Sequence, residues 1–271
     1  MTLLGAELRK LRRRPASYVV SIILIVLLLL FYLLIGATAQ SASALDRSSA
    51  AGFELLLGFP QAYSFVGSFI LGLGGLLAVT YGAAVSGAEW SWGTIRVVIA
   101  RGEGRTRYIV VQFAALAIAL AVMVLFAFFA GTLAALLAAS MGGVSTEGAF
   151  EADALLSLPE LLARTWMGVL LHAAVGFAVA SMLRSQLAGI GAGIALYVFE
   201  VVIGSLAPIL DADFARYLPF SVAGRVVGGE AEAFGQFDLL DPTVALVLAG
   251  VYLVVALAIA SLATERAEIT A

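Results

Sequence analysis

The sequence of 271 residues is 62% hydrophobic and only 12% charged, and its mean hydropathy is +1.07. Soluble domains are about half apolar and about a quarter charged, so this composition excludes a soluble globular protein and predicts an integral membrane protein. The net charge of -3 carries little information, because the positions of charges in a membrane protein matter more than their sum.

Several kinds of site are excluded by what the sequence lacks. It has no cysteine and a single histidine, His172, which excludes a zinc site, an iron-sulfur cluster and thiol catalysis. Its only lysine, Lys10, follows Arg9 and not a glycine, so the chain has no P-loop for ATP. We therefore expect no catalytic residue, no metal site and no cofactor in this chain. If ATP drives its function, another chain binds the ATP.

The first 15 residues have the pattern of an amphipathic helix. Leu3, Leu4, Leu8 and Leu11 fall on one helical face. Basic residues cover the remaining faces: Arg9, Lys10, Arg12, Arg13 and Arg14. Such a helix is expected to lie in the membrane interface, with leucines in the acyl boundary and cations on lipid headgroups. The sequence thus predicts an elbow helix over residues 1–15.

The alternative for this region is a signal peptide, because ATA followed by SASA near residue 40 resembles a cleavage site. The apolar run from Ala16 to Ala39 is much longer than the ~7 to 15 residues of a signal-peptide core. We therefore expect this run to be retained as the first membrane span.

Long apolar segments predict an all-α integral membrane protein with one transmembrane domain, residues 1–271. The six expected spans are 17–39, 62–87, 107–139, 165–183, 187–208 and 243–263. Within the loop before the fourth span, the LLSLPELLAR portion predicts a short interfacial helix. Two connections matter most: a charged segment, 88–106, between spans two and three, and a longer loop, 209–242, between spans five and six.

The distribution of basic residues predicts the orientation. Eleven of the 15 Lys and Arg residues fall on the side of the N-terminus, if the six spans alternate. The positive-inside rule then places both termini and segment 88–106 in the cytoplasm, and loop 209–242 outside. We expect a multi-pass protein of a prokaryotic plasma membrane.

Segment 88–106 carries a resemblance to a known family. Glu89 is followed by Gly93 and Thr94, and then by Arg105 and Arg107 just before the third span. With the elbow, the six spans and an LP element in loop 209–242, this order resembles the membrane subunit of type 2 ABC exporters. The layout covers the whole chain, but the motif covers only about twenty residues. The sequence departs from the pattern at three positions: Arg101 and Gly102, where the family often has proline, and Gln112, where lysine is common.

The resemblance implies a coupling helix that docks on a separate ABC-type ATP-binding subunit. The residues it assigns to this docking are Glu89, Gly93, Thr94, Arg96 and Arg101. It also implies two copies of the ATPase, which bind ATP and Mg²⁺, and a second permease subunit, expected to be identical. An alternative explanation of the arginines is that they only satisfy the positive-inside rule.

Two ionisable residues lie inside predicted spans, where a charge is costly and often functional. His172 in the fourth span and Glu200 in the fifth are each about 12 Å from the outer ends of a predicted hairpin, so their side chains could meet. One hypothesis is a polar pair in a translocation path. The alternative is a structural role, either in a His–Glu bond or for Glu200 packed in neutral form.

The leading hypothesis is therefore a non-enzymatic permease subunit of an ATP-driven exporter for a hydrophobic or amphipathic substrate, such as a drug, antibiotic, lipid or glycolipid. The second is an ion- or proton-coupled secondary transporter using Glu200 and His172; no inverted repeat supports it. The third is an intramembrane enzyme, for which a lone histidine and one glutamate are too few. Membrane lipids are expected partners and nucleic acid is not.

Overall fold

The computed structural model describes residues 3–43, 52–54, 56–210, 212–228 and 240–267, and all regular structure in these residues is helical. Six of the helices described are long and apolar enough to cross a membrane. They are α2 (Pro15–Ser43), α4 (Gln61–Ser91), α6 (Arg105–Gly142), α7 (Ala152–Leu183), α8 (Gln186–Leu210) and α10 (Pro242–Glu265). The prediction of six apolar helices is confirmed.

Shorter helices lie between or before these six. α1 (Leu3–Arg13) covers most of the predicted elbow, whose first two residues lie outside the described part. The others are α5 (Thr94–Ala100), η1 (Glu147–Phe150), η2 (Asp213–Tyr217) and α9 (Pro219–Val227). Both η2 and α9 belong to the predicted loop 209–242, of which residues 229–239 lie outside the described part.

The helices are longer than the predicted spans, because they continue past the apolar segments into polar sequence. α6 has 38 residues, about 57 Å, and so exceeds the ~30 Å hydrocarbon core. α7 begins at Ala152 and continues through Pro159 without interruption. The LLSLPELLAR segment, expected as a separate interfacial helix, is therefore the first part of α7.

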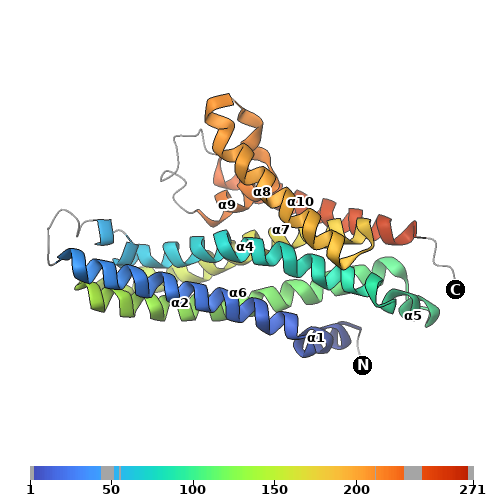
Figure 1. Cartoon of the computed structure of the whole chain (residues 1–271), viewed down its shortest axis with the longest axis horizontal. Coiled ribbons are helices and arrows are strands. Elements are labelled where there is room, and N and C mark those ends of the chain that lie inside the picture. The colour runs from blue at the N-terminus through green and yellow to red at the C-terminus, as the bar shows by residue number, and fades with distance from the viewer. Residues whose placement is uncertain (1–2, 44–51, 55, 211, 229–239, 268–271) are drawn as a thin grey trace.

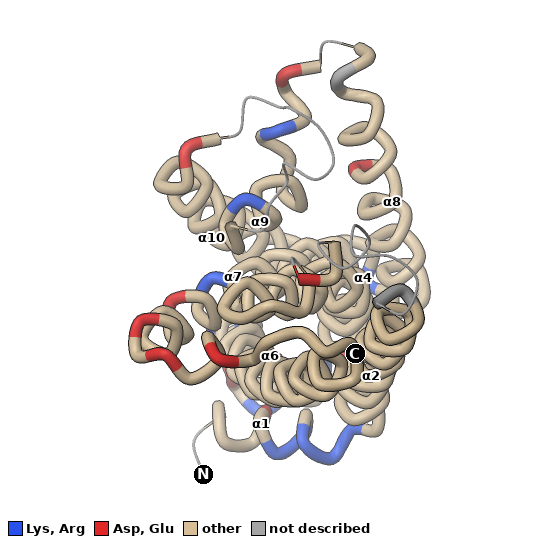
Figure 2. Tube along the Cα trace, turned by 90° about the vertical axis from the view of Figure 1, so that its left-hand side faces the viewer, with Lys and Arg blue, Asp and Glu red and all other residues tan. Residues whose placement is uncertain are grey.

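The long helices α2, α4 and α6 run side by side, and α8, α9 and α10 lie on one side of them (Figure 1). We call the end of the molecule that holds α1 and α5 the α5 end, and the opposite end the distal end. Viewed from the distal end, acidic residues gather where α7 begins, whereas the basic residues of α1 lie at the far end (Figure 2). The separation of charge along the sequence is thus also a separation in space.

The centre of the bundle is the contact between α4 and α7. A Cβ atom on Gly82 would lie 2.1 Å from the carbonyl oxygen of Ala173, and one on Gly176 would lie 2.0 Å from that of Val79. Only glycine lets the two backbones approach this closely, as is common between helices in membranes. A displacement of α4 therefore has to be accompanied by α7.

Candidate functional site

The connection between α4 and α6 is built as a short helix between two glycine turns. Gly93, which precedes α5, has φ of +69°, and Gly102, which follows it, has φ of +85°. L-residues with a side chain rarely adopt these left-handed conformations, so glycine is the natural residue at both turns. Thr94 is the first residue of α5, and Gly93 is its N-cap. The predicted cytoplasmic segment thus contains a defined helix.

One face of this connection is left uncovered. Ile95 is buried against the bundle, but Val97 is 51% exposed and Trp92, just before α5, is 65% exposed. Arg96 and Arg101 are also exposed. We call these four residues, Trp92, Arg96, Val97 and Arg101, the α5 surface. It combines apolar side chains with cations, as protein-binding surfaces commonly do.

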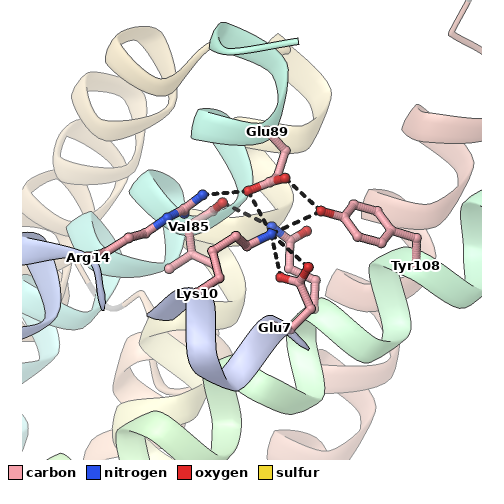
Figure 3. Close-up of polar contacts among 7 residues, drawn as sticks. Glu7, Lys10, Arg14, Val85, Glu89 and Tyr108 are labelled. Atoms are coloured by element: carbon pink, nitrogen blue, oxygen red, sulfur yellow. Dashed lines mark hydrogen bonds and ion pairs between the residues drawn. The ribbon is translucent and has the colours of Figure 1, made fainter. Parts of the chain in front are cut away.

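Glu89, in the last turn of α4, is at the centre of a buried polar network (Figure 3). Its side chain is 1% exposed and forms ion pairs with Arg14 at 2.6 Å and with Lys10 at 3.1 Å. The hydroxyl of Tyr108 donates a hydrogen bond of 2.6 Å to its second oxygen. Glu89 therefore joins α4 to α1, to α6 and to Arg14, which lies between α1 and α2, and it does not belong to the exposed α5 surface.

The other half of the network comes from α1. Lys10 also pairs with Glu7, with 2.7 Å between Nζ and Oε1, and it donates to the hydroxyl of Tyr108 at 3.1 Å. Arg14 lies over the ring of Trp92, 4.9 Å from its centroid. Two cations and two carboxylates thus balance one another in a largely buried cluster, which we call the Glu89 cluster: Glu7, Lys10, Arg14, Glu89 and Tyr108.

The basic residues of the predicted elbow therefore divide into two groups. Lys10 and Arg14 form ion pairs with Glu89 and are partly buried, while the side chains of Arg9, Arg12 and Arg13 are exposed. Glu7 and Tyr108 were not predicted from the sequence. A signal for Glu7 was present, because it falls on the same helical face as the leucines of α1, where a lipid-facing helix would not place a carboxylate.

A second polar contact holds the other end of the connection. The guanidinium of Arg105, in the first turn of α6, donates to the backbone carbonyls of Thr264, Glu265 and Ala267 at 3.3, 2.8 and 2.9 Å. The hydroxyl of Thr106 donates to the Glu265 side chain. Arginine commonly satisfies the last carbonyls of a helix in this way. Arg105 thus attaches the start of α6 to the end of α10.

Gln112 adds a link between α4 and α6 below the Glu89 cluster. Its side-chain amide donates to the carbonyl of Val85, one turn before Glu89, at 3.0 Å. The residue is buried. The position where the resembled family commonly has lysine is therefore used here for helix packing.

His172 and Glu200 are both buried, but the structure gives them different partners. The ring of His172 stacks on Phe220 with 4.6 Å between centroids, and its Nδ1 lies 2.8 Å from the carbonyl oxygen of Gly168. Glu200 accepts hydrogen bonds from the backbone N–H and the hydroxyl of Ser221, at 2.6 and 3.1 Å. The two residues thus contact neighbouring positions at the start of α9, and neither hydrogen bond joins them to each other.

The comparison with known families gives one match. Residues 47–269 match the family described as protein of unknown function DUF2705. The chain belongs to this family. The match includes α4 to α10, and so covers the α5 surface, Glu89, His172 and Glu200, whereas Lys10 and Arg14 precede it. No curated protein matches the sequence. The family description assigns no activity.

Proposed function

We propose that this protein is the permease subunit of an ATP-driven exporter, and that the α5 surface docks on a separate ATP-binding subunit. The observation that supports this most is an exposed short helix whose two flanks are tied to the ends of four other helices. A loop that only connects two spans needs neither an exposed Trp92 and Val97 nor such ties.

In this proposal the two polar contacts transmit movement of α5 into the membrane. The Glu89 cluster links the α4 side of α5 to α1 and α6, and Arg105 links the α6 side to α10. A push on α5 then acts on four helices together, and the close α4–α7 contact extends it to a fifth. This is rigid-body coupling through packed elements and polar networks.

The residues assigned by the resemblance take different roles in this proposal. Arg96 and Arg101 contact the ATPase, together with Val97 and Trp92. Gly93 sets the direction of α5 through its left-handed conformation, and Thr94 begins the helix. Glu89, which is buried, is a positioning residue that holds the base of α5.

The proposal places the α5 end in the cytoplasm of a prokaryotic cell, in line with the basic residues at that end (Figure 2). Two ATPase copies bind ATP and Mg²⁺, and a second permease chain completes the membrane path. A hydrophobic or amphipathic compound is the proposed cargo. The secondary-transporter alternative has less support, because His172 and Glu200 have separate partners.

The experiment is co-purification from cells that express this chain together with its neighbouring genes. We expect a P-loop ATPase to co-purify and to hydrolyse ATP. The substitution Val97→Asp places a charge in the apolar part of the α5 surface and should lower the recovered ATPase at least about tenfold, as loss of a binding hot spot does.

The matched control is Phe150→Asp, which introduces the same charge at an apolar residue that is 74% exposed at the distal end. This variant should retain the ATPase. Equal recovery with both variants would contradict docking at α5, and transport by the purified chain without any nucleotide-hydrolysing partner would contradict the proposed function as a whole.

A further inference from the structure

The distal end contains a helix that is too short to cross a membrane. α9 has nine residues, about 14 Å, against a hydrocarbon core of ~30 Å. Its residues Phe220, Val222, Ala223, Val226 and Val227 are buried. A helix end placed among apolar side chains needs hydrogen-bond partners for its first N–H groups, because neither lipid nor packed side chains supply them.

Glu200 of α8 supplies these partners. The first intrahelical bond of α9 runs from the N–H of Val222 to the carbonyl of Leu218. Pro219 has no N–H, so Phe220 and Ser221 carry the unpaired donors of the first turn. The Glu200 carboxylate accepts from the N–H of Ser221 at 2.6 Å and from its hydroxyl at 3.1 Å. A side chain from another helix thus caps the first turn of α9.

In the distal half of α8, Glu200 is the one described polar side chain that bonds to another helix. Among the described side chains from Val198 to Leu210, only Glu200 and Ala207 are buried. In Figures 1 and 2 this half of α8 stands away from the layer formed by α2, α4 and α6. Closer to its start α8 is packed tightly, since a Cβ atom on Gly189 would lie 2.4 Å from the Cβ of Ala180.

α7 and α10 also contact α9. The ring of Phe220 stacks on His172 of α7, and the hydroxyl of Tyr252 in α10 donates to the carbonyl of Tyr217, just before α9, at 2.6 Å. α9 therefore lies between a fixed side, formed by α7 and α10, and α8, which touches it through Glu200 and, one turn earlier, through the ring of Tyr197, 5.3 Å from that of Phe220.

We propose that Glu200 is a latch: its bond to the first turn of α9 holds the distal half of α8 against α9 and keeps the buried face of α9 covered. Breaking the bond lets the distal half of α8 swing away about its tightly packed first half and lets water reach the buried face of α9. This device is independent of the proposed partner ATPase.

The chain contains no cysteine, so an introduced cysteine is its only site for thiol labelling. Val222→Cys places a thiol on α9 at a residue that is 0% exposed. The variant is reconstituted in lipid nanodiscs, where both faces are accessible, and labelled with a charged maleimide. Adding Glu200→Met, which keeps the side-chain length and removes the acceptor oxygens, should raise the labelling rate about tenfold or more.

Two controls make the result specific. Glu200→Gln retains an acceptor oxygen and should keep the labelling rate within about twofold of the single-cysteine chain. Ala135→Cys reports on a buried position of α6, and its labelling should not change with Glu200→Met. Unchanged labelling of Val222→Cys in the Glu200→Met background would overturn the latch. An equal increase at position 135 would also overturn it, because the bundle as a whole would then be loosened.

Discussion

Two buried glutamates, Glu89 at the α5 end of the molecule and Glu200 in the distal half of α8, are held in opposite ways. Glu89 is 1% exposed and lies among two cations and a tyrosine hydroxyl, whereas Glu200 is 6% exposed and accepts from the backbone N–H and the hydroxyl of one serine. The first joins elements on either side of α5 through paired charges. The second joins α8 to α9 through a single helix cap.

The difference indicates that the two ends have different mechanical properties. A carboxylate paired with two cations on other helices is costly to expose or separate, so the α5 end should move as one body. A carboxylate that caps a short helix can be exchanged for water when the helix moves, so the distal end should open more easily. Substitutions in the two regions should therefore differ in how much stability they remove and in how many helices they affect.

The largest effect is expected from removing both cations of the Glu89 cluster with Lys10→Met and Arg14→Met. The Glu89 carboxylate would stay buried without a counter-charge, and breaking such a pair from one side costs about 3 to 5 kcal/mol. The measurement is the free energy of unfolding in mixed micelles.

Glu89→Gln should cost less, about 1 to 3 kcal/mol, because the side chains of Lys10 and Arg14 retain 25% and 11% exposure and can turn toward water. A larger loss for Glu89→Gln than for the double variant would contradict this asymmetry.

A smaller effect should separate the two halves of α8. Gly189→Ala places a Cβ atom against Ala180, and this overpacking should lower the free energy of unfolding by about 1 to 3 kcal/mol. Gly204→Ala lies in the distal half, where an added Cβ meets nothing within 4 Å. Since alanine also favours a helix more than glycine does, this variant should be neutral or more stable by up to about 1 kcal/mol. Similar losses of unfolding free energy from the two variants would mean that the distal half of α8 is packed as tightly as its first half.

The smallest of the three effects is expected at the contact between α6 and α10. Arg105→Gln removes the guanidinium that reaches Thr264, Glu265 and Ala267, with a loss of about 1 kcal/mol. The change should be local, so amide hydrogen exchange should become faster in the last turn of α10 and remain the same in α9. Arg107→Gln is the matched control, because Arg107 is largely exposed and its contact with Glu103 is 3.5 Å long. Faster exchange in α9 after Arg105→Gln would show that the two ends are not mechanically separate.

The sequence was sufficient to predict the membrane helices, because a span must be long and apolar whatever it packs against. It also located the charged connection at 88–106, where α5 is found. The ends of the helices were less predictable. α7 starts at Ala152, 13 residues before the predicted span, because a helix can continue into polar sequence beyond the membrane.

The polar contacts could not be predicted in the same way. Glu89 pairs with Lys10 and Arg14, which are about 75 residues or more away in sequence, and this pairing depends on how α1 folds back on the bundle. The sequence placed His172 and Glu200 at similar depths and left open whether their side chains meet. Depth leaves the rotation of each helix undetermined, and α9, within a predicted loop, lies against both.

The most direct test of the proposed coupling is site-specific photo-crosslinking in native membranes, with a photoreactive amino acid at position 97 and, as a control, at position 150. The account predicts a crosslink from position 97 to a P-loop ATPase and none from position 150. Crosslinks from position 97 to lipid alone, in membranes where the chain is active, would contradict it.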